Sequence, residues 1–137
     1  MIISLVLIAV AAVCNACMDT LAHHWDTSIF KDISAKSGSL FWADATQVSW
    51  RNKYVNGDPA QGRVKWKIFG FTVNKPVQFT DGWHLTKMIM IFALCAAVVC
   101  YHPQNTLITE TINFVVLGTV WNVVFSLFYD KLFRTKK

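Results

Sequence analysis

One face of the first apolar segment carries three polar side chains, Asn15, Asp19 and His23, at four-residue steps. Residues four apart lie on the same side of a helix, so these three are expected to line up. His24 lies about 100° further round the same turn. Polar groups inside an apolar helix are costly, and they usually face the interior of a helix bundle.

A second pair of ionisable side chains, Asp81 and His84, begins the next apolar segment. At the start of a helix Asp81 can cap the backbone, and the three-residue spacing places its carboxylate beside the imidazole. If both segments end at the same membrane surface, Asp19, His23 and His84 meet there, with His24 or Asp81 close by. Two imidazoles and a carboxylate suit a divalent metal, zinc or non-haem iron, with a position open for water or substrate. One hypothesis is therefore a metal-dependent membrane enzyme that hydrolyses a lipid or a lipid-linked substrate.

The alternative is a hydrogen-bonded polar network that joins the helices and carries no chemistry. The last apolar segment supplies polar residues at matching depths, and the expected neighbours are Asn15 with Asn122, Asp19 with Ser126, and His23 with Asp130. No motif of a known hydrolase or of a phosphate-binding loop decides between the two hypotheses. Whether the chain is an enzyme stays open.

The composition places these residues in a membrane protein. The chain has 137 residues and is 54% hydrophobic and 15% charged, whereas soluble domains carry about a quarter charged residues. Three segments are long and apolar enough to cross a bilayer, residues 2–24, 84–102 and 106–128. We therefore predict a single all-α integral membrane domain with three transmembrane helices. The first segment lacks the basic start of a secretory signal, so we expect it to remain as an anchor.

The basic residues predict the orientation. All thirteen Lys and Arg residues fall after the first segment: nine precede or begin the second segment, and four follow the third. Because Lys and Arg favour the cytoplasmic side, we predict the N-terminus outside and the C-terminus in the cytoplasm, in an inner or plasma membrane. The long segment of residues 25–83 is then cytoplasmic.

Residues 25–83 are too long for a bare connection, and we expect them to lie on the membrane surface. Residues 39–55 contain no Gly or Pro and have apolar residues at three- and four-residue steps, which predicts an amphipathic interfacial helix. A shorter helix is expected over residues 26–34. Residues 63–68 alternate basic and apolar side chains, which predicts a strand that pairs with residues 77–79 in a short β-hairpin.

The predicted strand places basic and aromatic side chains where lipid headgroups would lie. The residues expected to contact anionic headgroups are Arg63, Lys65, Trp66 and Lys67. Five of the six tryptophans fall in residues 25–83, as in an aromatic belt at the membrane surface. These rings are better used against lipid than against bases, so nucleic acid is not an expected partner.

Three classes of function remain open. The first is a small membrane protein that acts by contact with membrane lipids or by assembly, as a homo-oligomer or within a larger membrane complex. The second is the metal-dependent enzyme. The third is an oligomeric channel or transporter subunit, because three helices of one protomer cannot enclose a path. Stoichiometric metal in the purified protein would favour the second class, and ion flux in liposomes would favour the third.

Overall fold

The computed structural model describes residues 1–103 and 106–135 and is mostly helical. Its three long helices are α1 (Ile2–His23), α3 (Gly82–Val99) and α4 (Leu107–Ser126), and the last continues as a π-helix over Leu127–Phe133. The three stretches Ile2–His23, Gly82–Val99 and Leu107–Phe133 are each long and apolar enough to cross a membrane, as predicted. The second begins two residues earlier than expected, because Asp81 caps it.

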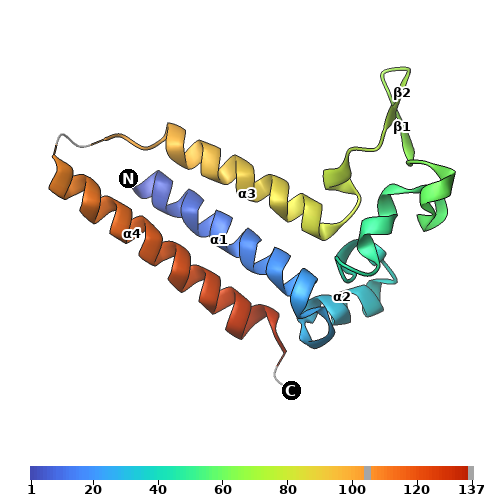
Figure 1. Cartoon of the computed structure of the whole chain (residues 1–137), viewed down its shortest axis with the longest axis horizontal. Coiled ribbons are helices and arrows are strands. Elements are labelled where there is room, and N and C mark those ends of the chain that lie inside the picture. The colour runs from blue at the N-terminus through green and yellow to red at the C-terminus, as the bar shows by residue number, and fades with distance from the viewer. Residues whose placement is uncertain (104–105, 136–137) are drawn as a thin grey trace.

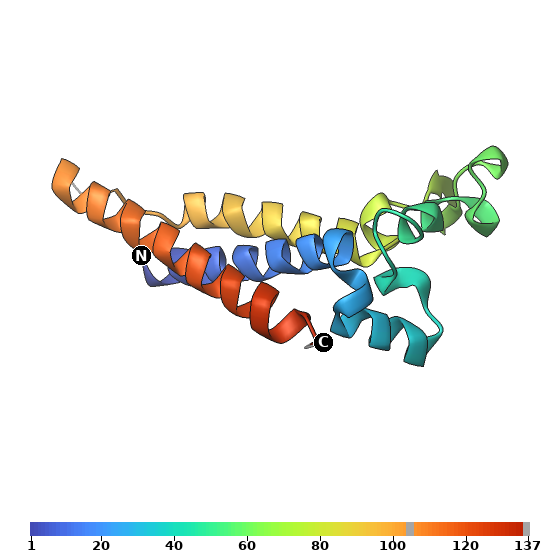
Figure 2. The same cartoon turned by 60° about the horizontal axis from the view of Figure 1, so that its bottom comes forward.

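The three helices lie side by side with α1 in the middle (Figure 1). The buried side chains of α1 and α3 include Ala12, Ala16, Ala93 and Ala97, and such small residues let helices approach closely. The Ser4 hydroxyl of α1 donates to the Ala97 carbonyl of α3 at 3.2 Å. By contrast, α4 crosses α1 at an angle (Figure 2), and none of its residues is buried. The pair of α1 and α3 is therefore the compact part of the layer.

Residues 25–81 form short elements beside one end of the helices. These are the α-helix α2 (Ile29–Ser37) and the 3-10 turns Trp25–Thr27, Leu40–Trp42, Ser49–Lys53, Val55–Gly57, Pro59–Gln61 and Val77–Phe79. The short helix predicted near residues 26–34 thus exists as α2.

The amphipathic helix predicted over residues 39–55 is wrong. The Ser39 hydroxyl caps only the short turn Leu40–Trp42, and Asp44 Oδ1 accepts from the Thr46 and Gln47 amides at 2.7 and 2.9 Å. Asn52 donates to the Leu40 carbonyl at 2.9 Å. Short polar side chains that bind nearby backbone compete with helix formation, and here they win over the apolar spacing.

The predicted β-hairpin exists, with a different partner strand. Strand β1 (Lys65–Ile68) pairs antiparallel with β2 (Phe71–Asn74), in the register Lys65 to Asn74 and Ile68 to Phe71. The two-residue turn between them, Phe69-Gly70, has positive φ at both positions, 48° and 84°. A turn of this hand matches the twist of the strands, so the chain folds back at once, before residues 77–79. We refer to Lys65–Asn74 as the hairpin.

An aromatic cluster fastens residues 25–81 to the helices. Its buried members are Cys17, Leu21 and Phe30, and its partly buried members are Trp25, Ile29, Trp42, Ala45, Trp83 and Phe133. We call this set the end cluster. The Trp25 indole donates to the Trp42 carbonyl at 2.8 Å. The C-terminal residues join it, since the Thr135 amide donates to the Thr27 carbonyl at 2.7 Å. The cluster therefore holds α1, α3, the C-terminal helix and the intervening segment together.

Candidate functional site

The start of α3 holds one aspartate and one histidine in direct contact. Both oxygens of Asp81 lie within 2.9 Å of His84 Nδ1. The same carboxylate accepts from the His84 amide at 2.9 Å and from the Thr80 hydroxyl at 3.0 Å, and Asp81 is only 1% exposed. Asp81 thus fixes the imidazole by Nδ1 and leaves Nε2 directed away from it. His84 also lines a shallow cavity of about 330 Å³ with Lys87 and Gln78.

The other candidate ligands do not join this pair. No three His, Cys, Asp or Glu residues lie close enough to hold a metal ion anywhere in residues 1–103 and 106–135. His23 and His24 instead line a different cavity, and Asp19 interacts electrostatically with Tyr129 of the C-terminal helix. The predicted cluster of Asp19, His23 and His84, with His24 or Asp81, is therefore not assembled. Helical spacing sets which side chains share a face but not how α1 and α3 are rotated against each other, and His84 faces Asp81 and a cavity that His23 and His24 do not line.

The predicted polar network between the first and last helices is also sparse. Asn122 donates to the Gly118 carbonyl of its own helix at 2.8 Å, and Asp130 lies 3.8 Å from Arg134 one turn away. Ser126 is exposed, and no described hydrogen bond joins it or Asn15 to another helix. The end of the first helix does approach the last helix, because the His24 and Tyr129 rings contact edge to face with centroids 5.4 Å apart.

A polar cavity of about 390 Å³ lies where α1 ends. Side chains of both charge signs line it, and the ionisable ones are His23, His24, Asp26, Asp44 and Arg134. Residues 22–27 form one wall, the turn at residues 44–47 another, and the C-terminal segment a third. We call this space the polar cavity. Sequence reasoning placed the two histidines near this depth and missed Asp44 and Arg134, which only the folding of residues 39–55 brings close.

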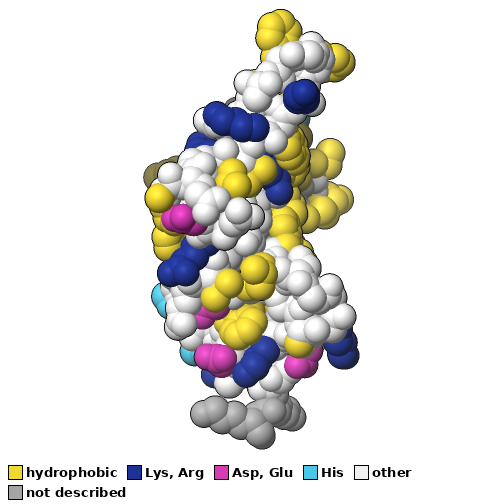
Figure 3. All heavy atoms as spheres, turned by 90° about the vertical axis from the view of Figure 1, so that its right-hand side faces the viewer, with side chains coloured by type: hydrophobic (Ala, Val, Ile, Leu, Met, Phe, Trp, Pro, Cys, Tyr) yellow, Lys and Arg dark blue, Asp and Glu magenta, His cyan; other side chains and the backbone are white. Residues whose placement is uncertain are grey.

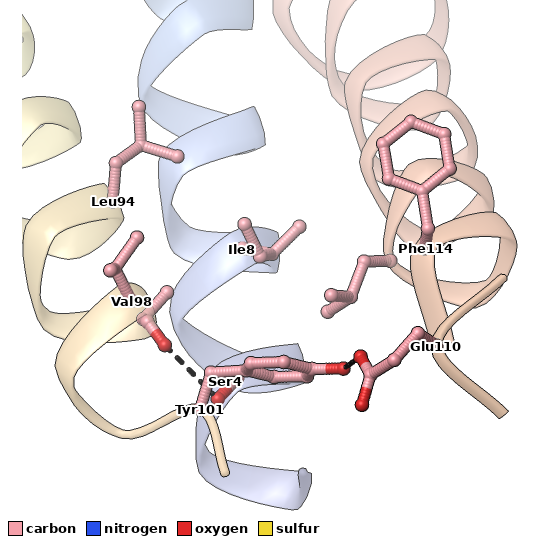
Figure 4. Close-up of a pocket in the computed structure, with 9 residues that line it drawn as sticks. Ser4, Ile8, Leu94, Val98, Tyr101, Glu110 and Phe114 are labelled. Atoms are coloured by element: carbon pink, nitrogen blue, oxygen red, sulfur yellow. Dashed lines mark hydrogen bonds between the residues drawn. The ribbon is translucent and has the colours of Figure 1, made fainter. Parts of the chain in front are cut away.

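The opposite end of the helices has an apolar cavity of about 480 Å³ between α1, α3 and α4 (Figure 4). Tyr101 lies across its end and donates a hydrogen bond to Glu110, which joins the residues after α3 to α4. Asn113 in turn donates to the Tyr101 hydroxyl at 3.2 Å. The hydrogen bond to Glu110 raises the pKa of Tyr101, an effect that the Asn113 bond partly offsets. Sequence reasoning noted Glu110 only as a charge. The sequence signal for this contact was Asn113, which lies one helical turn from Glu110 and so shares its face.

The predicted lipid-contacting residues lie on and beside the hairpin. Lys65 Nζ donates to Asn74 at 2.7 Å, and the Trp66 ring stacks on Phe79 with centroids 5.6 Å apart. Arg63 donates to the Lys75 carbonyl at 3.4 Å, while its buried Nε has no hydrogen-bond partner among the described residues. Residues 63–79 contain four basic residues and no Asp or Glu. Their charges are therefore not neutralised from within that stretch.

Sequence reasoning missed one feature of the hairpin, the exposure of the aromatic side chains at its turn. Phe69 is 96% exposed and Phe71 is 74% exposed. Phe69 also adopts φ of 48°, a conformation that a bulky residue rarely takes and that Asn or Gly takes readily. The signal was present in the sequence as a Phe-Gly-Phe stretch after the alternating strand.

Comparison of the chain with models of known protein families, with curated proteins and with solved structures finds no match.

Proposed function

We propose that the chain is an integral membrane protein that uses its hairpin to hold an anionic lipid surface. The observation that carries the proposal is the exposed Phe69 at the turn, in a backbone conformation unfavourable for phenylalanine. Residues in sparsely populated backbone conformations cluster at binding and active sites. An aromatic side chain placed there has no packing role within the chain.

The surroundings of the turn suit a lipid surface. Lys65 and Lys67 precede it, and Lys75 lies with its ammonium 5.6 Å from the centre of the Trp66 ring. Aromatic side chains enter the headgroup region readily, and each nearby Lys or Arg adds attraction to anionic lipids. Figure 3 supports this interpretation: hydrophobic and basic side chains occupy the projecting end of this face, and acidic ones gather elsewhere.

The three long helices supply the anchor in this proposal. Their length and composition suit three membrane crossings, and the basic residues favour a cytoplasmic hairpin and C-terminus. The hairpin then faces the leaflet that carries most anionic lipid. Assembly with further copies or with a larger complex would use the exposed face of α4.

Hydrogen exchange of the full-length protein in lipid nanodiscs tests the proposal. Adding phosphatidylglycerol to phosphatidylcholine discs should slow exchange at the backbone amides of residues 69–71, and raised ionic strength should reverse the effect. The polar turns at residues 55–61 serve as an internal control, because they carry no exposed aromatic tip. Phe69→Asn removes the ring and introduces a residue that tolerates positive φ, so it should abolish the slowing of exchange. Equal exchange in both kinds of disc would refute the proposal.

A second candidate, a membrane enzyme with His84 as general base, is supported by the Asp81 contact and the adjoining cavity. Release of fatty acid from a total lipid extract by the reconstituted protein, lost in His84→Gln, would favour it. An activity unaffected by that substitution would exclude His84 as the base.

A further inference from the structure

The polar cavity lies at the level where two candidate membrane crossings end. Helix α1 ends at His23, and the apolar stretch Leu107–Phe133 ends one residue before Arg134. The hydrogen bond from Thr135 to Thr27 holds Arg134 beside the residues that follow α1. If these helices cross a bilayer, as the proposed function states, the cavity is at headgroup depth, where Trp25 on its wall is also favoured.

The two carboxylates of the cavity are available to a ligand. Asp44 uses Oδ1 to accept from the Thr46 amide and hydroxyl and from the Gln47 amide, while Oδ2 makes no hydrogen bond within the described part of the chain. Asp26 has only a solvent-exposed contact with Lys31 at 3.4 Å. Two carboxylates in one polar cavity attract a cation that can donate hydrogen bonds.

The cationic side of the cavity is equally available. Arg134 lies 3.8 Å from Asp130, beyond the distance of a good hydrogen bond, and its guanidinium also rests over the Tyr129 ring. The His23 side chain makes no hydrogen bond or ion pair within residues 1–103 and 106–135, and the His24 ring makes an edge-to-face contact with Tyr129. A guanidinium beside two imidazoles is a typical donor set for phosphate oxygens.

We propose that the polar cavity binds a phosphoethanolamine group, with the phosphate at Arg134 and the histidines and the ammonium at Asp44 and Asp26. A cavity with both charge signs matches a zwitterion better than a lone phosphate, which the carboxylates repel, or a lone cation, which Arg134 repels. The primary ammonium of ethanolamine donates hydrogen bonds to carboxylates, whereas the quaternary ammonium of choline cannot. The cavity therefore distinguishes phosphatidylethanolamine from phosphatidylcholine.

Native mass spectrometry of the full-length protein with defined lipids tests this assignment. Phosphatidylethanolamine should bind at least about tenfold more tightly than phosphatidylcholine or phosphatidylglycerol, since charge-assisted hydrogen bonds are lost with either. Soluble glycerophosphoethanolamine, measured by thermal shift in detergent, separates headgroup recognition from attachment to a lipid. Stabilisation by this compound would show that the headgroup alone is sufficient.

Two charge-removing variants assign the two halves of the ligand. Asp44→Asn keeps the oxygen that accepts from the turn, so it should fold and lose the preference for ethanolamine over choline. Asp58→Asn is the matched control, because Asp58 caps another turn through Ala60 and lies outside the cavity. Arg134→Gln should weaken binding of both lipids about tenfold, and Arg51→Gln, an exposed arginine elsewhere, should not.

Equal binding of ethanolamine and choline lipids by the unmodified protein would overturn the assignment, as would unchanged preference in Asp44→Asn. A preference for phosphatidylglycerol alone would show an anion site instead. These outcomes are separate from failure of the proposed function, because the hairpin exchange experiment uses discs that contain no phosphatidylethanolamine.

Discussion

The end cluster and the hairpin are both aromatic, yet they use their rings in opposite ways. In the end cluster, Trp25, Trp42 and Trp83 are partly buried and pack against the buried Leu21 and Phe30 of the same chain. The Phe30 ring stacks on Trp42 with centroids 5.5 Å apart. In the hairpin, the rings at the turn meet no neighbour of comparable size and stay exposed. An exposed ring without a partner in the chain is therefore a stronger indication of a membrane-surface role than aromatic content alone.

The two regions also differ in the signs of their charged side chains. At the end of the helices near the end cluster, two carboxylates, two imidazoles and a guanidinium line the polar cavity. A further carboxylate, that of Asp81, caps α3. In residues 63–79, which include the hairpin, all four charged residues are basic. We expect substitutions near the end cluster to change the stability of the protein, and substitutions in the hairpin to change its attachment to lipid.

The largest effect is expected at Gly82, the first residue of α3. A Cβ added there would lie 2.2 Å from the Trp42 ring, which is itself held against Phe30. Gly82→Ala should lower the free energy of unfolding by about 3 kcal/mol, because the overlap must displace the indole from the end cluster. Thermal unfolding in detergent measures it.

Gly118→Ala is the matched control for Gly82→Ala. Gly118 lies in α4, and a Cβ added there would meet no atom within 4 Å. Gly118→Ala should therefore leave the free energy of unfolding unchanged or raise it by up to about 1 kcal/mol. If Gly82→Ala were as harmless as Gly118→Ala, the end cluster would not be the tightly packed joint that we describe.

A smaller loss of stability is expected at Asp81. Asp81→Ala removes the cap of α3 and the partner of the His84 imidazole, and it should cost about 2 kcal/mol. Asp58→Ala removes an exposed cap of a short turn and should cost about 0.5 kcal/mol. Chemical unfolding of both variants gives the comparison. Equal losses would mean that burial adds nothing to the Asp81 interactions.

The sequence allowed the long helices and the first strand of the hairpin to be predicted, because their signals are local, but it predicted the wrong partner strand. Long apolar stretches predict α1, α3 and α4, and the alternation of basic and apolar residues predicts β1. The helix predicted over residues 39–55 is wrong because Asp44 accepts from the Thr46 and Gln47 amides and Asn52 donates to the Leu40 carbonyl, and a continuous helix would use these backbone groups itself. The ligand cluster failed because its assembly depends on how helices rotate against each other, which helical spacing alone does not determine.

At the opposite end of the helices, Tyr101 donates a hydrogen bond to Glu110. Tyr101 must keep its proton to make this bond, which is why its pKa is raised above the ordinary value of about 10. The stabilisation from this bond is complete below that value and is lost as the pH rises through the raised pKa. The stability difference between the protein and Tyr101→Phe should therefore vanish in alkaline solution. A difference that persists there would show that the hydroxyl acts through other contacts.

The smallest change in stability is expected in the hairpin itself, where Phe69→Asn should raise stability slightly. The left-handed conformation costs a residue such as phenylalanine about 1–2 kcal/mol, and asparagine tolerates it better. In detergent without anionic lipid, exchange of the β1 and β2 amides should slow by the equivalent of up to about 1 kcal/mol.

Phe69→Ala separates the effect of the ring from that of the backbone, because it removes the ring and keeps the unfavourable backbone conformation. A hairpin that is less stable with asparagine would mean that Phe69 packs within the chain, and the contrast with the end cluster would fail. A hairpin that gains stability while losing lipid attachment would mean that the ring is retained at a cost to folding, as a residue that serves binding should be.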